Sequence, residues 1–241
     1  MDQTLSIVIP VYNEAENIGQ VFREVEAKLH MPYRILVVYD SDLDTTLPVV
    51  REWQKGHGQI QLLQNRYGHG ALNAIRTGFD AVAEGAVLVM MADLADDLVA
   101  VDAMFAKINQ GYDIVCGSRY MKGGRQLGGP LVKRTLSRLA GRSLHYLIGL
   151  PTHDATNSFK IYSKKVLDAI AIESRGGFEL GLELVVKAFV QGYQIAEVPS
   201  IWQDRVAGAS RFRLWHWLPH YLTWYWYGIK HGLLRSRPSV P

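Results

Sequence analysis

The sequence predicts an α/β protein in which helices flank a mostly parallel central sheet, and two observations lead to this prediction. Short apolar runs rich in β-branched residues alternate along the chain with segments whose apolar residues recur at helical spacing. Polar or acidic turns follow several of these runs, as expected where strands end at one edge of a sheet. The chain has 241 residues, 48% of them hydrophobic and 20% charged, so it can bury a complete core.

The first half of the chain holds four strand-like runs, and the first three lead through a turn into a helical pattern. The runs cover residues 5–11, 34–39, 60–63 and 87–93. Ile18, Val21 and Phe22 form the apolar face of the first helix. The second helix is expected at 49–53 and the third after Gly70. Strands joined by helices imply right-handed crossovers between parallel strands.

The second half continues the alternation but is more basic. Strand-like runs lie at 114–120, after the polar loop 154–160, and at 193–198. A helix from Leu131 carries Arg134, Arg138 and Arg142 four residues apart, which places them in one stripe. A solvated helix face and an anion site explain this stripe about equally well. Residues 122–125 are expected to form a mobile loop because they contain two glycines.

Carboxylate and amide side chains follow three of the predicted strands. They are Asn13 and Glu14, the acidic segment 40–44, and Asp93. Ligands of open α/β sheets bind outside the carboxyl ends of the strands, so Asp93 is placed to hold a divalent cation and its phosphates. Asp96 and Asp97 are better interpreted as caps of the helix expected near Leu98.

Several classes of protein are excluded. No G-x-G-x-x-G or G-x-x-x-x-G-K-[ST] segment is present, so neither a dinucleotide fold nor a P-loop enzyme is supported. A net charge of +3 is too small to indicate a nucleic-acid partner. The single cysteine, Cys116, excludes an internal disulfide framework and fits a reducing compartment. We expect a cytoplasmic protein, because neither a signal peptide nor a spanning segment is visible.

Residues 212–241 differ from the rest of the chain. Tryptophan and tyrosine crowd between residues 215 and 227, and basic residues flank them. This pattern predicts amphipathic aromatic helices in the membrane interface, although a helix packed on the domain or on a second subunit is the alternative. We therefore expect a domain at 1–211 and a membrane-interface tail at 212–241, attached peripherally to the cytoplasmic face of the membrane.

Six motifs in order resemble glycosyltransferase family 2, in its dolichol-phosphate mannosyltransferase-like branch. They lie at residues 7–14, Asp40, 91–93, 117–120, 154–156 and 204–211. The resemblance implies a GT-A (Rossmann-like) fold. It also implies inverting transfer of a sugar from GDP-mannose or a UDP-sugar to a polyprenyl phosphate, dolichyl or undecaprenyl.

The same resemblance implies roles for individual residues. The nucleotide sugar would be bound by Pro10, Tyr12, Glu14, Asp40, Ala92, Asp93 and Arg119. The acceptor phosphate would be bound by Arg134, Ser137, Arg205 and Arg211. Asp93 would hold Mg²⁺ or Mn²⁺ and, with Arg119 and Arg205, would serve catalysis by stabilising the charge of the departing diphosphate.

Four positions depart from the pattern of this family. Tyr39 and Met91 stand where the family has aspartates, and Ala95 where a polar residue is frequent. A thioether is a poor ligand for a hard cation, so the cation is expected to bind weakly. Ser158 replaces a glycine and is expected to restrict the backbone there.

Two other functions fit the sequence. A family member that uses a saccharide or another hydroxyl acceptor would need a carboxylate base, for which Glu179 and Glu183 are the candidates. A phosphate acceptor is already anionic and needs no strong base. The losses at Tyr39 and Met91 also fit a non-catalytic protein that binds a nucleotide sugar or a lipid phosphate. The oligomeric state is left open.

Overall fold

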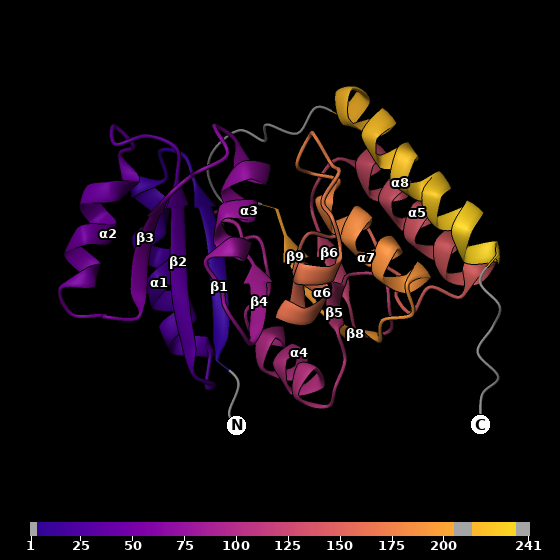
Figure 1. The fold of residues 1–241 in the computed structure, drawn as a ribbon, viewed down its shortest axis with the longest axis horizontal. Coiled ribbons are helices and arrows are strands. Elements are labelled where there is room, and N and C mark those ends of the chain that lie inside the picture. The colour runs from indigo at the N-terminus through magenta and orange to yellow at the C-terminus, as the bar shows by residue number, and fades with distance from the viewer. Residues whose placement is uncertain (1–3, 205–213, 235–241) are drawn as a thin grey trace.

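The computed structural model describes residues 4–204 and 214–234, and it confirms the predicted α/β architecture. Seven strands form one sheet in the order β3-β2-β1-β4-β7-β5-β8, with helices on both faces (Figure 1). Neighbouring strands are parallel except around β7, which runs antiparallel to β4 and β5. A separate pair of short parallel strands joins β6 to β9.

The elements alternate as the sequence predicts. The strands are β1 (Leu5–Val11), β2 (Tyr33–Tyr39), β3 (Ile60–Gln64), β4 (Ala86–Val89), β5 (Ile114–Ser118), β6 (Arg125–Leu127), β7 (Lys160–Ser163), β8 (Ile195–Pro199) and β9 (Ile201–Gln203). The helices are α1 (Ala15–Lys28), α2 (Thr46–Gln54), α3 (Ala71–Asp80), α4 (Ala100–Asn109), α5 (Leu131–Ile148), α6 (Lys164–Ala169), α7 (Leu180–Val190) and α8 (Leu214–Leu234).

Both faces of the sheet are buried, because side chains alternate along each strand. In β1, Ile7 and Ile9 join the core cluster beneath α1 and α4, whereas Val8 joins the cluster beneath α3 and α7. Strands buried on both faces have near-continuous apolar sequences, which is why β1, β2 and β4 were recognisable.

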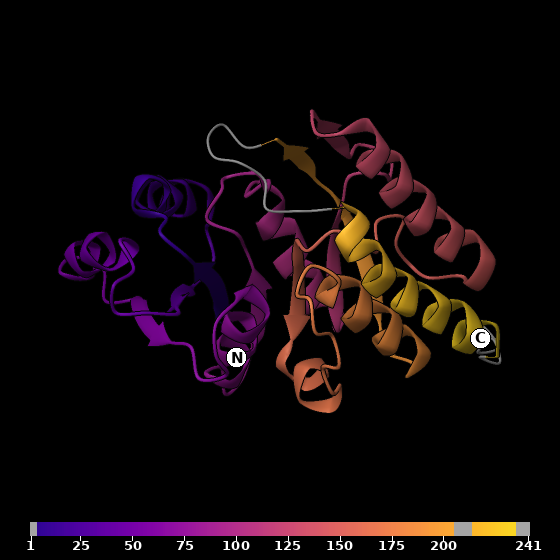
Figure 2. The ribbon, with the colours of Figure 1, turned by 90° about the horizontal axis from the view of Figure 1, so that it is seen from above.

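Helices α5 and α8 lie side by side, and α8 also packs on the outside of α7 (Figure 2). They run parallel: the Cα of Gly228 faces Leu144 and that of Gly232 faces Ile148, four residues further along each helix. A Cβ at Gly232 would lie 2.8 Å from Ile148, so these glycines allow the close approach. The predicted aromatic helices are thus a single described helix, with one face packed on the domain.

Three local predictions are wrong. Residues 122–125 form a turn that leads into β6 rather than a mobile loop, because β6 pairs with β9. The strand before Asp93 ends at Val89, so Asp93 lies in the following turn. The second helix, expected at 49–53, begins earlier, at Thr46, and ends at Gln54.

Candidate active site

The loops after β1 and β2 are joined by hydrogen bonds at the carboxyl edge of the sheet. Asp44 accepts a hydrogen bond from the backbone N–H of Asn13 (3.1 Å), and the Asn13 side chain accepts one from the N–H of Thr45 (3.1 Å). Thr46 accepts one from the N–H of Glu14 (2.8 Å). Asn13 has a φ of 58°, an uncommon value for a residue other than glycine. These contacts fix the segment predicted to hold the nucleoside.

Asp40 supports the loop that precedes α3. Its carboxylate accepts hydrogen bonds from the Asn65 side-chain amide (2.7 Å) and from the N–H of Gly70 (2.8 Å). The structure brings Asp40, Pro10 and Glu14 to the same edge of the sheet, with Tyr12 half exposed beside them. Asp40 thus shapes the wall of the predicted nucleoside site through its neighbours.

Asp93 lies in a tight turn beyond β4. Its Oδ1 accepts a hydrogen bond from the N–H of Ala95 (3.2 Å), and Leu94 between them has a φ of 56°. Leu94 and Asn13 are the non-glycine residues with positive φ in the part of the chain that the structure describes. Backbone strain of this kind concentrates at functional sites, and here it occurs on both sides of the predicted nucleotide site.

Asp96 lies near Asp93, and it does not cap a helix. Burial, together with the negative charge of Asp93, raises the pKa of Asp96 to about 7. Asp97 accepts hydrogen bonds from the N–H groups of Val99 (3.1 Å) and Ile201 (3.1 Å). Since α4 begins only at Ala100 and its N-cap makes no side-chain hydrogen bond, the cap interpretation is wrong for Asp96 and incomplete for Asp97.

The raised pKa of Asp96 predicts a pH-dependent stability. Between about pH 4 and 7, folded Asp96 keeps a proton that the unfolded chain loses, so the free energy of unfolding should fall as pH rises. Asp96→Asn should remove this fall and make the protein about 1–3 kcal/mol more stable than wild type at pH 8. Urea-induced unfolding at pH 5 and pH 8, with a chelator present, measures the free energy of unfolding of both proteins. The control variant is Asp42→Asn, at an exposed position. An equal effect of Asp96→Asn at both pH values would contradict the assignment.

Arg119 and Asp154 form the central ion pair of the site. The Asp154 carboxylate is fully buried and accepts hydrogen bonds from Arg119 Nε (2.7 Å), Nη2 (2.8 Å) and the backbone N–H (3.0 Å). Burial opposes the Arg119 charge, but Asp154 outweighs it and raises the Arg119 pKa above its ordinary value. Arg119 also donates to Ser137 on α5 (3.1 Å), which joins Thr156 (2.6 Å).

Residues that sequence reasoning did not assign hold this ion pair in place. Glu197 on β8 accepts hydrogen bonds from the N–H of His153 (2.8 Å), its ring Nδ1 (2.6 Å) and the Thr152 hydroxyl (3.2 Å). Buried Lys160 donates to the carbonyls of Ala155 (3.1 Å) and Asn157, and burial lowers its pKa. The motif at 154–156 predicts that this loop belongs to the site. No local pattern in the sequence predicts that Glu197 holds the loop in place.

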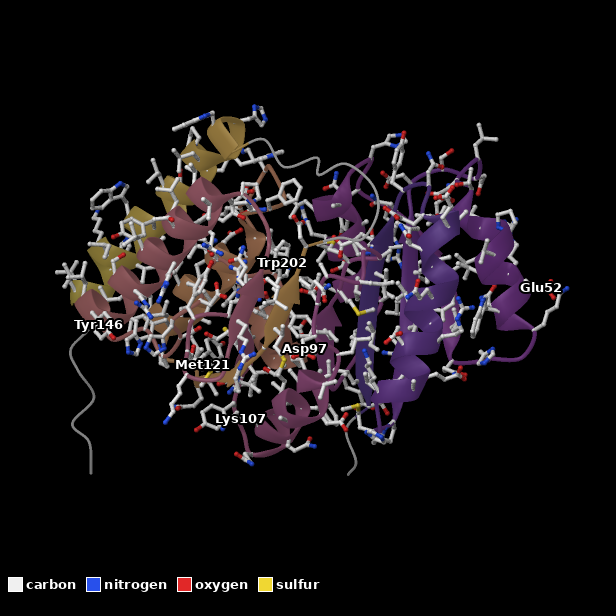
Figure 3. All side chains as sticks on the ribbon, turned by 180° about the vertical axis from the view of Figure 1, so that it is seen from behind. Glu52, Asp97, Lys107, Met121, Tyr146 and Trp202 are labelled. Atoms are coloured by element: carbon white, nitrogen blue, oxygen red, sulfur yellow. The ribbon has the colours of Figure 1, made fainter. Side chains whose placement is uncertain are left out.

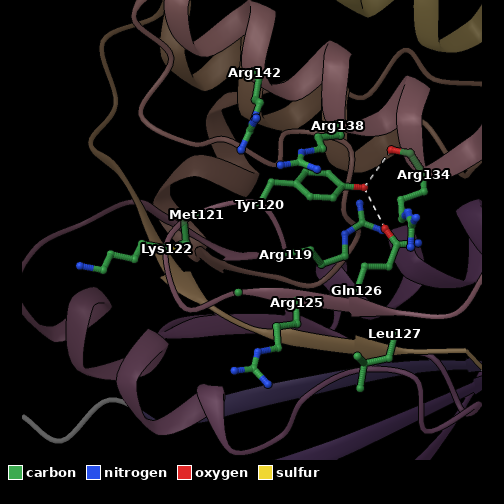
Figure 4. Close-up of a pocket in the computed structure, with 11 residues that line it drawn as sticks. Arg119, Tyr120, Met121, Lys122, Arg125, Gln126, Leu127, Arg134, Arg138 and Arg142 are labelled. Atoms are coloured by element: carbon green, nitrogen blue, oxygen red, sulfur yellow. Dashed lines mark hydrogen bonds between the residues drawn. The ribbon is translucent and has the colours of Figure 1, made fainter.

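A cleft lined by cations opens between α5 and the segment 119–127. It has a volume of about 710 Å³, and Arg134, Arg138 and Arg142 reach into it from α5 (Figure 4). Arg119 and Arg125 line the opposite side. The Arg119 guanidinium thus contacts Asp154 and also lines the open cleft. A phosphate in this cleft would match the charge and the planar geometry of the guanidinium.

Strand β9 connects this cleft to the Asp93 turn. The N–H of Gln203 donates to the carbonyl of Ala95 (3.1 Å), and that of Asp204 to the carbonyl of Leu127 (3.0 Å). Asp97 and Trp202 lie on the same face of the molecule (Figure 3). Arg205 and Arg211, predicted to bind phosphates, lie outside the described residues.

The two glutamates considered as catalytic bases are structural. Glu183 is fully buried and accepts hydrogen bonds from the N–H groups of Glu173 (2.6 Å) and Ser174 (2.9 Å) and from Lys187 (2.7 Å). Glu179 is equally buried and accepts from the N–H of Gly176 (2.8 Å). Their carboxylates fix the loop before α7, so a role for either as a catalytic base is not supported.

Three of the positions that depart from the family pattern, Tyr39, Met91 and Ser158, fit their surroundings in the structure. Tyr39 packs against one core cluster and Met91 against the other, so both side chains contribute to packing. Ser158 is not among the residues with positive φ, so the serine brings no strain to its loop. Among the described residues, no group of three or more His, Cys, Asp or Glu side chains is arranged to hold a metal.

The sequence of the chain is similar to those of known proteins. Residues 6–171 match the sequence profile of "Glycosyl transferase family 2". A dolichol-phosphate mannosyltransferase of Pyrococcus furiosus is 27% identical over 87% of the chain and 59% of its own length. A polyprenol monophosphomannose synthase of Mycolicibacterium smegmatis is 29% identical over 87% of the chain and 81% of its own length. The chain therefore spans about three fifths of the archaeal relative.

Solved structures confirm the expected GT-A fold. Glucosyl-3-phosphoglycerate synthase from Mycobacterium tuberculosis in complex with uridine diphosphate superposes with a TM-score of 0.69 at 16% identity, over 95% of this chain and 80% of that one. The same enzyme with Mn²⁺, uridine diphosphate and glucosyl-3-phosphoglycerate gives a TM-score of 0.66 at 17% identity, over 99% and 81%. At this identity, the likeness concerns the fold alone.

Proposed function

Because the chain belongs to glycosyltransferase family 2 and is a glycosyltransferase, we propose that it transfers a sugar, with inversion, from a nucleotide sugar to a polyprenyl phosphate. The observation that carries this proposal is the arginine-lined cleft, joined to the Asp93 turn through β9. Its cations match an acceptor whose nucleophile is a phosphate. The names of both relatives favour mannose as the transferred sugar. The donors to test are therefore GDP-mannose and, as the alternative, a UDP-sugar.

The proposed mechanism depends on charge and alignment rather than on a base. A phosphate oxygen held at Arg119, Arg134 and Ser137 is already anionic, so it can attack the anomeric carbon without losing a proton. The buried glutamates then need no catalytic role. Asp93 would organise the donor diphosphate, and Arg205 and Arg211 would add positive charge as the diphosphate departs.

The carboxylates of Asp93 and Asp96 suit Mg²⁺ or Mn²⁺, because hard cations are often held by one or two carboxylates together with substrate phosphates. When bound, the cation would neutralise charge on the diphosphate. Met91 offers a thioether and Ala95 a methyl group, neither of which is a ligand for such a cation. We expect weak cation binding in the absence of the donor and stronger binding with it.

The test of the proposed function is transfer of radiolabelled sugar. Wild-type protein is incubated with GDP-mannose, UDP-glucose or other nucleotide sugars and either a polyprenyl phosphate or a free saccharide. We expect a chloroform-soluble product from the polyprenyl phosphate with one donor and none from the saccharide. Transfer to the saccharide alone would favour the hydroxyl-acceptor alternative, and donor binding without turnover would favour the non-catalytic one.

Exposed apolar side chains on α5 and α8 support attachment to a membrane surface. On α8, Trp215 and Trp226 are 76% and 61% exposed, whereas Trp224 is buried against Lys187. On α5, Leu139 and Tyr146 are 60% and 74% exposed. None of the described helices has the length and apolar content needed to cross a bilayer. We propose that residues 1–211 carry transfer and that 212–241 attach the protein peripherally to the cytoplasmic face of the membrane.

This arrangement predicts binding to vesicles through the exposed tryptophans. Changing Trp215 and Trp226 to Ser should lower the partition coefficient about tenfold or more, because aromatic side chains gain free energy at the interface. Flotation with phosphatidylcholine and phosphatidylglycerol vesicles measures the partition. The matched control changes Leu43 and Val99, exposed apolar residues outside these helices, to Ser. Equal flotation of the two variants would refute the membrane-facing assignment of α8.

A further inference from the structure

The cationic stripe of α5 extends beyond the residues that the proposed acceptor phosphate requires. Arg138 and Arg142 lie one and two turns after Arg134, so Arg142 is about 12 Å further along the helix axis. A second cavity of about 430 Å³ adjoins the main cleft and is lined by Arg134, Thr135, Arg138, Leu139 and Arg142. Arg119 does not line it. The arginine stripe therefore serves two adjacent cavities.

Arg138 and Arg142 have no counter-ion among the residues that the structure describes. Within residues 4–204 and 214–234, neither Arg138 nor Arg142 forms an ion pair with a carboxylate, and the Nε of Arg142 is buried without a hydrogen-bond partner. Asp154, the acidic partner of the cleft residue Arg119, is already engaged in that ion pair. A buried donor without an acceptor costs free energy, and it is rare in folded proteins.

The spacing of the arginines along α5 adds a further energetic cost. Like charges four residues apart on a helix repel each other, and the stripe contains two such pairs in succession, Arg134 with Arg138 and Arg138 with Arg142. An oxyanion between the side chains would turn this repulsion into attraction and would supply the acceptor that Arg142 Nε lacks. Figure 4 shows both Arg138 and Arg142 directed from α5 into the cleft.

We propose that Arg138 and Arg142 form a second oxyanion subsite, which binds the phosphate of a molecule other than the sugar acceptor. The ligand chemistry is a phosphate monoester or diester flanked by apolar surface, since exposed Leu139 lines the same cavity. A phospholipid headgroup and a soluble glycerol phosphate both carry this group. The subsite is defined by its own residues and does not depend on which acceptor receives the sugar.

The test compares two double variants with the same change in charge. Arg138→Gln with Arg142→Gln removes the subsite, and Arg23→Gln with Arg51→Gln removes two exposed arginines from α1 and α2 at the other end of the molecule (Figure 1). One arm measures cosedimentation with phosphatidylcholine vesicles with and without phosphatidylglycerol. The other measures glycerol 1-phosphate binding by calorimetry. Neither arm measures sugar transfer, so a wrong acceptor assignment would leave the outcome unchanged.

We expect the Arg138/Arg142 variant to bind either phosphatidylglycerol vesicles or glycerol 1-phosphate about tenfold or more weakly than the Arg23/Arg51 variant does. Loss of charge-assisted hydrogen bonds to a phosphate has an effect of this size. A difference in the vesicle arm identifies a lipid headgroup, and one in the calorimetric arm alone identifies a soluble phosphate. If the double variant does not fold, Arg138→Gln alone, at an exposed position, is carried through both arms. Equal binding by subsite variant and control in both arms overturns the proposal.

Discussion

Replacing Asp154 by Asn is expected to lower the free energy of unfolding by about 3–5 kcal/mol. The asparagine keeps the size of the side chain but removes the charge that faces Arg119, whose side chain is only 9% exposed. A buried guanidinium then has no counter-ion, and removal of one partner from a buried ion pair is far more costly than removal of both. Urea-induced unfolding followed by circular dichroism measures the change.

Two comparisons make this prediction specific. Glu24→Gln breaks the partly exposed Lys28–Glu24 pair on the surface of α1 and should cost less than about 1 kcal/mol. The double change Asp154→Leu with Arg119→Met removes both charges of this pair, and it should be less destabilising than Asp154→Asn alone. If Asp154→Asn costs no more than Glu24→Gln, the ion pair does not organise this part of the fold.

Asp93→Asn is expected to lower the rate of sugar transfer about 10²–10³-fold while leaving the fold intact. The asparagine oxygen can still accept the hydrogen bond from the N–H of Ala95, so the turn should persist. What is lost is the negative charge that would organise a cation and the donor diphosphate. Initial rates at saturating Mn²⁺, together with an unfolding curve, separate the loss of transfer from a loss of stability.

The matched control for this variant is Asp168→Asn, an exposed aspartate on α6. Its transfer rate should remain within about twofold of wild type, because a surface ion pair contributes little. A loss below about tenfold for Asp93→Asn, combined with a large loss for Asp96→Asn, would move the organising carboxylate from Asp93 to Asp96. The proposed mechanism would then need a different geometry at this turn.

The order of strands and helices was predictable because both signals are local. Ile7, Val8 and Ile9 already carry the β-branched pattern of a doubly buried strand, and the helices carry their apolar faces at regular spacing. The short strands β6 and β9 were missed, since three residues give no periodic pattern. Their pairing depends on contacts between segments far apart in the chain.

The candidate site was predictable in part, through the motifs rather than the spacing. The sequence marked Arg119 and the 154–156 loop separately, but nothing showed that these groups, 35 residues apart, form an ion pair. Glu183 looked available on a helix face, yet it is buried because backbone N–H groups of residues 173 and 174 donate to it. Trp224 likewise belongs to the core, because α8 turns that side toward α7. Such partners come from other segments, which local patterns do not reveal.

The position of β7 in the sheet has a consequence for how the protein folds during synthesis. β7 lies between β4 and β5 and joins the halves of the sheet, but it is made only after residue 160. Until then, β4 has an open edge, with its hydrogen-bonding groups unpaired on that side. We expect the first four strands to fold early, before β7 has been synthesised. The contacts of β7 with β4 should form slowly, because these strands are far apart in sequence. The Asp93 turn would thus take shape before the Arg119–Asp154 pair can close.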